Sequence, residues 1–290
     1  MKSNDFEKRL YVVATPIGNL TDISQRAVDI LKQVDVILCE NTKHSLRLLN
    51  HYGICPKKIF KLTEYESQKD IQRYLSHCEK NGIALISDAG TPLISDPGKG
   101  IVEMAHGSGF GVLSVPGPCA VIAALSICPF QVMPFSFEGF LSRKKGERVE
   151  KLNKMKTQSG AMVFYESPNR VLAFCEDLMS VFGRDRQVFV VKELTKRFEC
   201  YWKGSLQEVC TELVDANKQG EFVVIVAGDD ASSDDGMEGE ELISLQGCMQ
   251  QMKESGVSLS SAKRILAPLV AIGKNKLYQR LLVIYGEEEK

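Results

Sequence analysis

Short runs of apolar residues alternate with amphipathic stretches over the first 230 residues of the chain. The runs are three to six residues long and rich in Val, Ile, Leu and Phe, which is typical of buried strands. They occupy residues 10–14, 34–39, 58–62, 84–86, 112–115, 135–140, 161–165, 187–191 and 222–227, with a further candidate at 198–202.

Between these runs, apolar residues recur at the spacing of a helix face. In the first such stretch Thr21 and Asp22 are the expected cap of a helix that runs to Lys32, with Ala27 and Leu31 on its apolar face. Further helices are expected over residues 45–52, 68–81, 98–106, 120–127, 171–182 and 206–218. Strands that alternate with helices through short links predict an α/β fold with parallel sheet.

The elements fall into two groups, and 290 residues are enough for two modest cores. Residues 128–134 interrupt the alternation and predict a crossing between an N-terminal α/β domain, 1–127, and a second α/β domain, 128–228, with more mixed strand pairing. Residues 229–241 hold seven acidic residues and no Lys or Arg, which predicts a mobile linker. Residues 242–290 predict a small helical appendix with helices over 242–253, 260–270 and 274–284, the second capped by Ser258 or Ser260.

Charge and cysteine usage narrow the class of protein. Lys and Arg number 36 against 37 Asp and Glu, so a site for a polyanion must be a local patch. The segment 143–156 is such a patch, with seven basic and two acidic residues, although a solvated helix face would have the same composition. Nine scattered Cys without a CxxC pair, and a charged start without an apolar signal core, predict a cytoplasmic protein with reduced thiols, no metal site and no membrane segment.

The common catalytic motifs are missing from the sequence. It contains no phosphate-binding P-loop, no dinucleotide-binding glycine fingerprint and no serine nucleophile elbow. Its four His, at 44, 51, 77 and 106, are not paired at metal-binding spacing.

What remains is a set of loops that follow the predicted strands: TPIGN (15–19), CENTK (39–43), SDAGTPLISDPG (87–98), VPGPCA (115–120), YESPNR (165–170) and KELTK (192–196). Strand ends of a parallel sheet lie along one edge, so we expect the loops to converge on one cleft. Their small residues favour a neutral or zwitterionic ligand over a triphosphate. Each loop taken singly is also compatible with an ordinary turn, in which Asp88 and Asp96 only shape the loop.

These motifs resemble the tetrapyrrole methylase superfamily. The resemblance is carried by 13–20 with Asp22, Ile23, Arg26 and Ala27, by 85–98 and 115–118, by FEGFL (137–141), by YESP (165–168) with Arg170, and by ELTK (193–196) with Glu199. A weaker match follows at KNKLY (274–278). Within the superfamily the chain is most similar to the bacterial branch that methylates a cytidine ribose 2′-hydroxyl in 16S rRNA.

The resemblance implies two α/β domains with S-adenosylmethionine in the cleft between them, a homodimer, and 16S rRNA of the small ribosomal subunit as partner. Carried onto this sequence, it implies cofactor contacts from Pro16, Gly90, Thr91, Pro92, Ile94, Cys119, Ala120, Tyr165, Glu221 and Phe222. The chain departs from the family pattern at Asn41, Lys43, the segment 64–66, Cys119 and Lys192.

Methyl transfer to a hydroxyl requires alignment of donor and acceptor and removal of a proton. Glu40, Glu193 and Lys196 are the candidates for that proton transfer, although each is also compatible with a structural ion pair. The candidates for RNA binding are Lys43, Arg143, Lys144, Lys145, Arg148 and Arg170. Two alternatives stay open: a corrin or porphyrin methylase of the same superfamily, and a non-catalytic protein that binds RNA or the ribosome.

Overall fold

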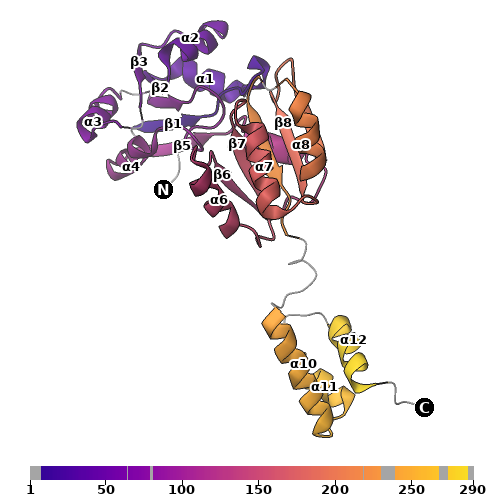
Figure 1. Ribbon diagram of the computed structural model, residues 1–290. Coiled ribbons are helices and arrows are strands. Elements are labelled where there is room, and N and C mark those ends of the chain that lie inside the picture. Colours follow the sequence, from indigo (N-terminus) through magenta and orange to yellow (C-terminus); the bar gives the residue numbers. More distant parts are fainter. Residues whose placement is uncertain are drawn as a thin grey trace. The chain divides into compact units, whose positions relative to one another are not determined.

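The computed structural model describes residues 8–63, 65–78, 81–217, 219–229, 239–267 and 274–286. The chain divides into two compact units, Met1–Asn153 with Ala161–Ala227 and Lys154–Gly160 with Gly228–Lys290. Figure 1 shows the elements of both units. Within the described residues, none of the helices has the length and apolar character needed to cross a membrane.

A five-stranded parallel sheet forms the first half of the larger unit, with strand order β3-β2-β4-β1-β5. Its strands are β1 (Arg9–Val13), β2 (Val36–Cys39), β3 (Lys58–Lys61), β4 (Ile83–Ile86) and β5 (Gly111–Val115). On one face it packs against α1 (Gln25–Gln33) and α2 (Thr42–His51), and on the other against α3 (Gln68–Ser76) and α4 (Lys99–Gly107) (Figure 1). Every residue of β2 and β4 is buried, which explains their uninterrupted apolar sequences.

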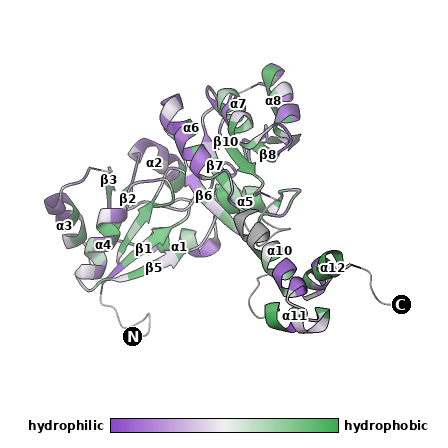
Figure 2. Ribbon diagram, turned by 60° about the horizontal axis from the view of Figure 1, so that its bottom comes forward, coloured by the Kyte–Doolittle hydropathy of each residue, from purple (hydrophilic) through white to green (hydrophobic). Residues whose placement is uncertain are grey.

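A second five-stranded sheet follows, with order β6-β7-β10-β8-β9 and mixed pairing as predicted. Its strands are β6 (Phe135–Gly139), β7 (Ala161–Glu166), β8 (Gln187–Lys192), β9 (Cys200–Ser205) and β10 (Phe222–Val226), and only β6 and β7 pair in parallel. The helices of this half are α6 (Lys145–Lys154), α7 (Val171–Phe182) and α8 (Leu206–Asp215). The hydropathy colouring shows the central strands β1, β2 and β10 as hydrophobic (Figure 2).

Helix α5 (Ala120–Ser126) lies on the N-terminal side of the expected domain boundary at residue 127. Its apolar side chains Val121, Ala124 and Leu125 nevertheless pack on the second sheet, in a cluster with Phe189 of β8 and Ile225 of β10. The α/β fold with two sheets is confirmed, and α5 carries the chain from the first sheet to the second.

Some predicted helix ends were wrong. Residues Leu20–Asp22 form a separate 3₁₀ turn, and α1 begins at Gln25, because Ser24 caps it by accepting the Ala27 N–H. Helix α3 ends at Ser76 and α8 at Asp215, in both cases before the predicted end.

The smaller unit contains the helices α10 (Gly239–Glu254), α11 (Leu259–Leu266) and α12 (Lys274–Tyr285). They share a core of Leu245, Met249, Ala262, Leu266, Leu277 and Leu281. Ser258 caps α11 as predicted, and its hydroxyl accepts the Ser261 N–H. Of the predicted linker, residues 230–238 lie outside the described residues, and Gly239 already begins α10.

Candidate active site

A cavity of about 340 Å³ is lined by residues from both sheets of the larger unit. Five of the six predicted loops reach it, and the start of β10 adds further residues. The lining residues are Ile17, Ala89, Gly90, Thr91, Ile94, Ser95, Asp96, Cys119, Ala120, Phe140, Tyr165, Glu166, Ser167, Pro168, Val191, Leu194, Gly220, Glu221, Phe222 and Val223. Its volume lies within the range of small-molecule sites.

The loop after β4 is tied to the loop after β1 by a short backbone bridge. Gly90 donates its N–H to the Thr15 carbonyl at 3.0 Å, and Thr15 donates its N–H to the Gly90 carbonyl at 2.9 Å. Gly90 has φ of +81°, and a Cβ there would lie 3.3 Å from Ile17 Cγ2. The backbone conformation therefore favours glycine, a side chain there would crowd Ile17, and the Gly90 N–H is already used in the bridge to Thr15.

None of the described residues that line this cavity is Lys or Arg, whereas Asp96, Glu166 and Glu221 are acidic. Glu166 pairs with Arg170 at 3.1 Å and Glu221 pairs with Lys196 at 3.0 Å, whereas no ion pair joins Asp96 to another of the described residues. The wall is otherwise apolar or small. Such a lining suits a ligand that carries positive charge and no phosphate.

Tyr165 forms part of the wall and packs edge-on against Phe137 and Phe140, with ring centroids 4.8 and 5.5 Å away. Burial, together with the nearby Cys119, raises the pKa of the Tyr165 hydroxyl. The hydroxyl therefore stays protonated and can act as a hydrogen-bond donor.

Eight of the ten residues predicted to contact the cofactor line this cavity, and their role stays a prediction. Pro16 and Pro92 are the exceptions, because both are buried and belong to the packing behind the loops.

A second cavity, of about 830 Å³, adjoins the first and shares Ser95 and Asp96 with it. It is lined by the ends of β2, β3 and β4 and by the start of α4, with Glu40 and Lys43 from the sixth predicted loop. The six loops thus lead to two neighbouring cavities instead of one cleft.

Four carboxylates line this second cavity, Glu40, Glu66, Asp88 and Asp96, and Glu66 is hydrogen-bonded to Thr63 and Tyr74. Burial and the negative charges of Asp88 and Asp96 raise the pKa of Glu40, and Lys61 and His44 only partly oppose this. Burial also raises the pKa of Asp96, with a smaller contribution from Asp88, against a hydrogen bond from Ser87. Asp96, interpreted from the sequence as shaping its loop, is the carboxylate common to both cavities.

Glu193 and Lys196 line neither cavity, although both were candidates for proton transfer. Lys196 Nζ lies 2.8 Å from Glu193 Oε1 and 3.0 Å from Glu221 Oε2, and the Glu221 N–H donates to Glu193 Oε1 at 3.0 Å. Burial favours a raised pKa for Glu193, but these hydrogen bonds and the lysine charges lower it overall. The pair ties the loop after β8 to β10, as expected of a structural ion pair.

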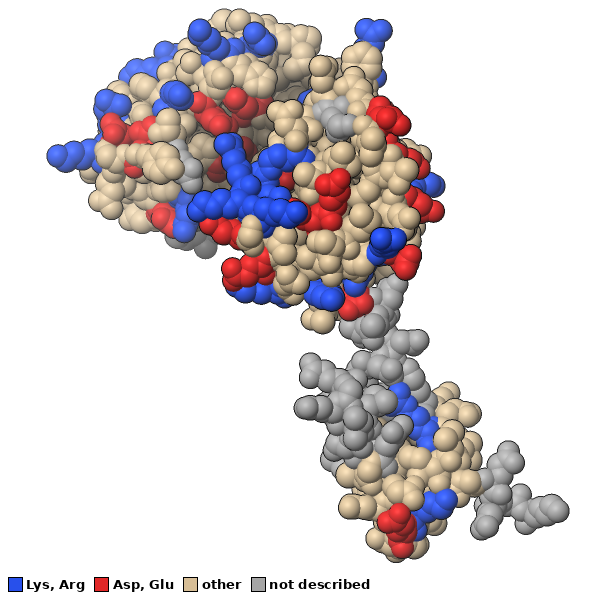
Figure 3. Space-filling view, viewed as in Figure 1, with Lys and Arg blue, Asp and Glu red and all other residues tan. Residues whose placement is uncertain are grey.

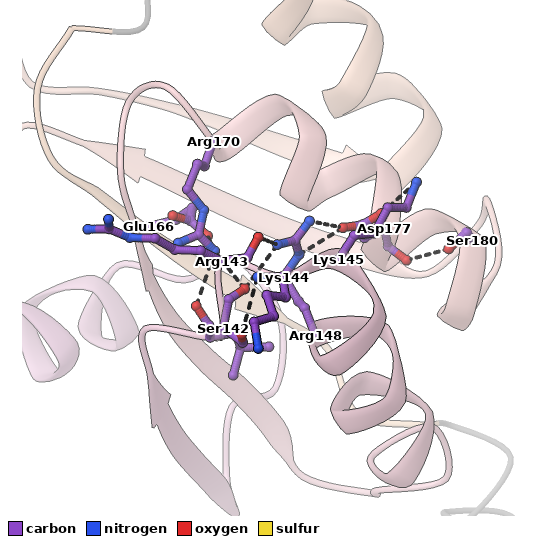
Figure 4. Close-up of polar contacts among 10 residues, drawn as sticks. Ser142, Arg143, Lys144, Lys145, Arg148, Glu166, Arg170, Asp177 and Ser180 are labelled. Carbon is purple, nitrogen blue, oxygen red and sulfur yellow. Dashed lines mark hydrogen bonds and ion pairs between the residues drawn. The ribbon is translucent and has the colours of Figure 1, made fainter.

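The basic segment forms a cluster of Lys and Arg on the surface around the start of α6 (Figure 3). Two of the arginines predicted to bind RNA, Arg148 of this segment and Arg170 of the loop 165–170, instead bind other groups of the protein (Figure 4). Arg148 is buried, with its Nε 2.8 Å from Asp177 Oδ2, and it also donates to the Ser142 carbonyl. Arg170 pairs with Glu166 and donates to the same carbonyl at 3.2 Å. These two side chains hold the loop of residues 141–145 in place by donating to its carbonyl groups, so they are not available to bind RNA.

Arg143, Lys144 and Lys145 are the exposed cations of this loop. Lys144 lies 2.8 Å from Glu147, and Lys145 lies 3.4 Å from Asp177. The Lys144–Glu147 pair is exposed, and Lys145 is itself exposed although Asp177 is buried, so the three cations remain available to a phosphate backbone.

The model of the family described as Tetrapyrrole (Corrin/Porphyrin) Methylases matches residues 9–210. This chain belongs to the tetrapyrrole methylase family. The family predicted from the sequence motifs is thereby confirmed. Solved structures agree at the level of the fold: a cobalt precorrin-4 methyltransferase aligns with TM-score 0.57 and 15% identity over 78% of this chain and 97% of its own. A *Thermus thermophilus* uroporphyrin-III C-methyltransferase complexed with S-adenosyl homocysteine aligns with TM-score 0.52 and 18% identity over 78% and 99%.

Curated relatives of this methylase are more similar in sequence. A *Vibrio cholerae* protein is 40% identical over 96% of this chain and 96% of its own length. A *Thermotoga maritima* protein is 39% identical over 76% of this chain and 98% of its own. Both are named Ribosomal RNA small subunit methyltransferase I.

Proposed function

We propose that this protein transfers a methyl group from S-adenosylmethionine to a cytidine ribose 2′-hydroxyl in 16S rRNA of the small ribosomal subunit. The observation that carries the proposal is the 40% identity, over nearly the whole of both chains, to a relative named as a small-subunit rRNA methyltransferase. The tetrapyrrole methylase family supplies the reaction class, methyl transfer from S-adenosylmethionine.

The charge of the first cavity and its mostly apolar wall suit S-adenosylmethionine. The cofactor carries a sulfonium and an ammonium group and no phosphate, which agrees with acidic side chains and with the absence of Lys and Arg among the described lining residues. Asp96 is the carboxylate we expect to meet the positive end, while Tyr165 and Phe222 flank the apolar part. When bound, the cofactor supplies an already activated methyl group.

The second cavity adjoins this site and is the proposed place of the acceptor ribose. Glu40 is the residue we favour as proton acceptor, because its raised pKa makes it a stronger base than an ordinary glutamate. The network around Glu193 and Lys196 then holds the cofactor side of the site in shape.

For RNA we propose contacts from Arg143, Lys144 and Lys145 on the 141–145 loop and from Lys43 at the second cavity. Arg148 and Arg170 support that loop from behind. We further propose that the protein works as a homodimer in the cytoplasm, where small subunits are assembled.

The direct test uses labelled S-adenosylmethionine and small ribosomal subunits from cells that lack the protein. We expect one ribose-methylated cytidine in 16S rRNA. Cofactor binding without transfer to RNA would favour the non-catalytic alternative. Transfer to a corrin or porphyrin, with none to the subunit, would favour the tetrapyrrole methylases represented among the solved structures.

A further inference from the structure

The second cavity carries an aromatic ring at its edge that the protein itself does not bury. Tyr65 lines this cavity and is 90% exposed, which is the largest exposed fraction among the large apolar side chains of the described residues. An aromatic ring with its faces in water has unused surface for stacking. Its position beside a cavity that adjoins the cofactor cavity suggests a ligand with a flat face.

The backbone that displays Tyr65 is braced on both sides. Glu66 accepts hydrogen bonds from the Thr63 N–H and hydroxyl at 3.1 and 3.0 Å, and the largely buried Tyr74 donates to Glu66 at 3.3 Å. The Tyr74 hydroxyl also lies 3.3 Å from the Lys61 carbonyl at the end of β3. Tyr65 is therefore followed directly by a residue, Glu66, that hydrogen bonds to Thr63 and Tyr74 hold in place.

The basic residues of the second cavity are more exposed than its acidic residues. Its three lysines, Lys43, Lys61 and Lys99, are exposed, whereas its four acids, Glu40, Glu66, Asp88 and Asp96, are partly buried. Phosphates are attracted by the lysines and repelled by the acids within. Carboxylates accept hydrogen bonds from hydroxyl and amino groups, so a ribose and a base suit the interior better than a phosphate.

We propose that the base of the target nucleotide stacks on Tyr65 while its ribose occupies the second cavity. The inference rests on the proposed function and adds to it a binding residue for the acceptor nucleotide. The flanking phosphates lie outside, by the exposed lysines. RNA recognition of this kind, in which an unstacked base packs on an aromatic side chain, is common for single-stranded nucleotides.

The test compares Tyr65→Ala with Tyr65→Phe. For the alanine variant we expect kcat/KM for small subunits to fall between about fivefold and 150-fold, which is the usual loss when a stacking ring is removed. The fall should reside mainly in KM for the subunit. The phenylalanine variant keeps the ring and should stay within about twofold of wild type. The Kd for S-adenosylmethionine should be unchanged in both variants, because Tyr65 does not line the first cavity.

Phe198→Ala is the matched control, since Phe198 is 68% exposed and lines neither cavity. We expect it to keep the wild-type kcat/KM. Wild-type kcat/KM in Tyr65→Ala would overturn the inference while leaving the proposed function standing. Weakened cofactor binding in the same variant would also overturn it, because a structural role would then explain the loss. Failure of the wild-type protein to methylate the subunit would refute the proposed function and, with it, the inference.

Discussion

Arg148 organises the residues around it although it belongs to a strongly basic surface segment. Its side chain is 8% exposed, and its guanidinium bonds to Asp177 and donates to the carbonyls of Ser142 and Arg143. Removing one partner of a buried ion pair leaves the other charge without compensation. The basic composition of the segment therefore combines a structural arginine with exposed cations.

We expect Arg148→Ala to lower the free energy of unfolding by about 3–5 kcal/mol, measured by denaturant titration. Lys144→Ala, in the same segment, should leave it nearly unchanged because Lys144 is exposed. Equal stability of the two variants would contradict the structural role of Arg148.

Glu40 allows a pH test of the proposed proton acceptor. A base acts when ionised, so activity should fall as the pH drops through its pKa. Because burial and two neighbouring acids raise the pKa of Glu40, that fall should occur above the ordinary glutamate value of about 4.3.

The measurement is kcat/KM for small subunits against pH. Glu40→Gln should reduce kcat by about 10²- to 10⁴-fold and remove this acid limb. Glu193→Gln should keep the limb, because the pKa of Glu193 is lowered and its carboxylate is paired with Lys196. If Glu193→Gln loses the acid limb and Glu40→Gln keeps it, Glu193 would be the proton acceptor and Glu40 would not.

At the scale of elements, the site is built from loops that leave the strands and are then joined to each other. The loop 87–98 depends on glycine at two places. Gly90 forms the bridge to Thr15, and at Gly98, with φ of +138°, a Cβ would lie 2.9 Å from Leu85 Cδ2. The loop can approach the ligand and the sheet closely because these positions carry no side chain.

Gly90→Ala should strain this loop and crowd Ile17, and both lie at the first cavity. We therefore expect S-adenosylmethionine to bind roughly tenfold more weakly, which corresponds to a loss of about 1.4 kcal/mol. Isothermal titration calorimetry measures this directly. Gly109→Ala is the matched control: its φ is +76°, but a Cβ there meets nothing within 4 Å and it lies outside the cavity. Both variants should lose some stability through backbone strain, and only Gly90→Ala should lose cofactor affinity.

At the scale of the whole molecule, the α/β unit and the helical unit have separate cores. All residues that line the two cavities precede residue 224. The α/β unit is therefore expected to hold the cofactor without the three helices.

A chain that ends at Asp229 should fold and bind S-adenosylmethionine with a Kd within about twofold of the full chain. Circular dichroism and calorimetry check the two statements in turn. A folded truncated chain that fails to bind the cofactor would show that the helical unit completes the site.

The sequence by itself determined the α/β class, nearly every strand, the loops of the site and the family. These features are local: strands buried on both faces must be continuously apolar, and the Gly- and Pro-rich loops cannot continue as strand or helix. The motifs 87–98 and 15–19 were sufficient to predict the family because each is long and specific.

The tertiary structure decided which polar side chains face which partner. It separated Glu40 from the Glu193–Lys196 pair, buried Arg148 against Asp177, and placed Asp96 and Tyr65 at the cavities. The structure also showed that α1 begins at Gln25, later than predicted, and that α5 packs on the second sheet. Ion pairing and burial depend on residues distant in the chain, and a residue's own sequence neighbourhood does not contain that information.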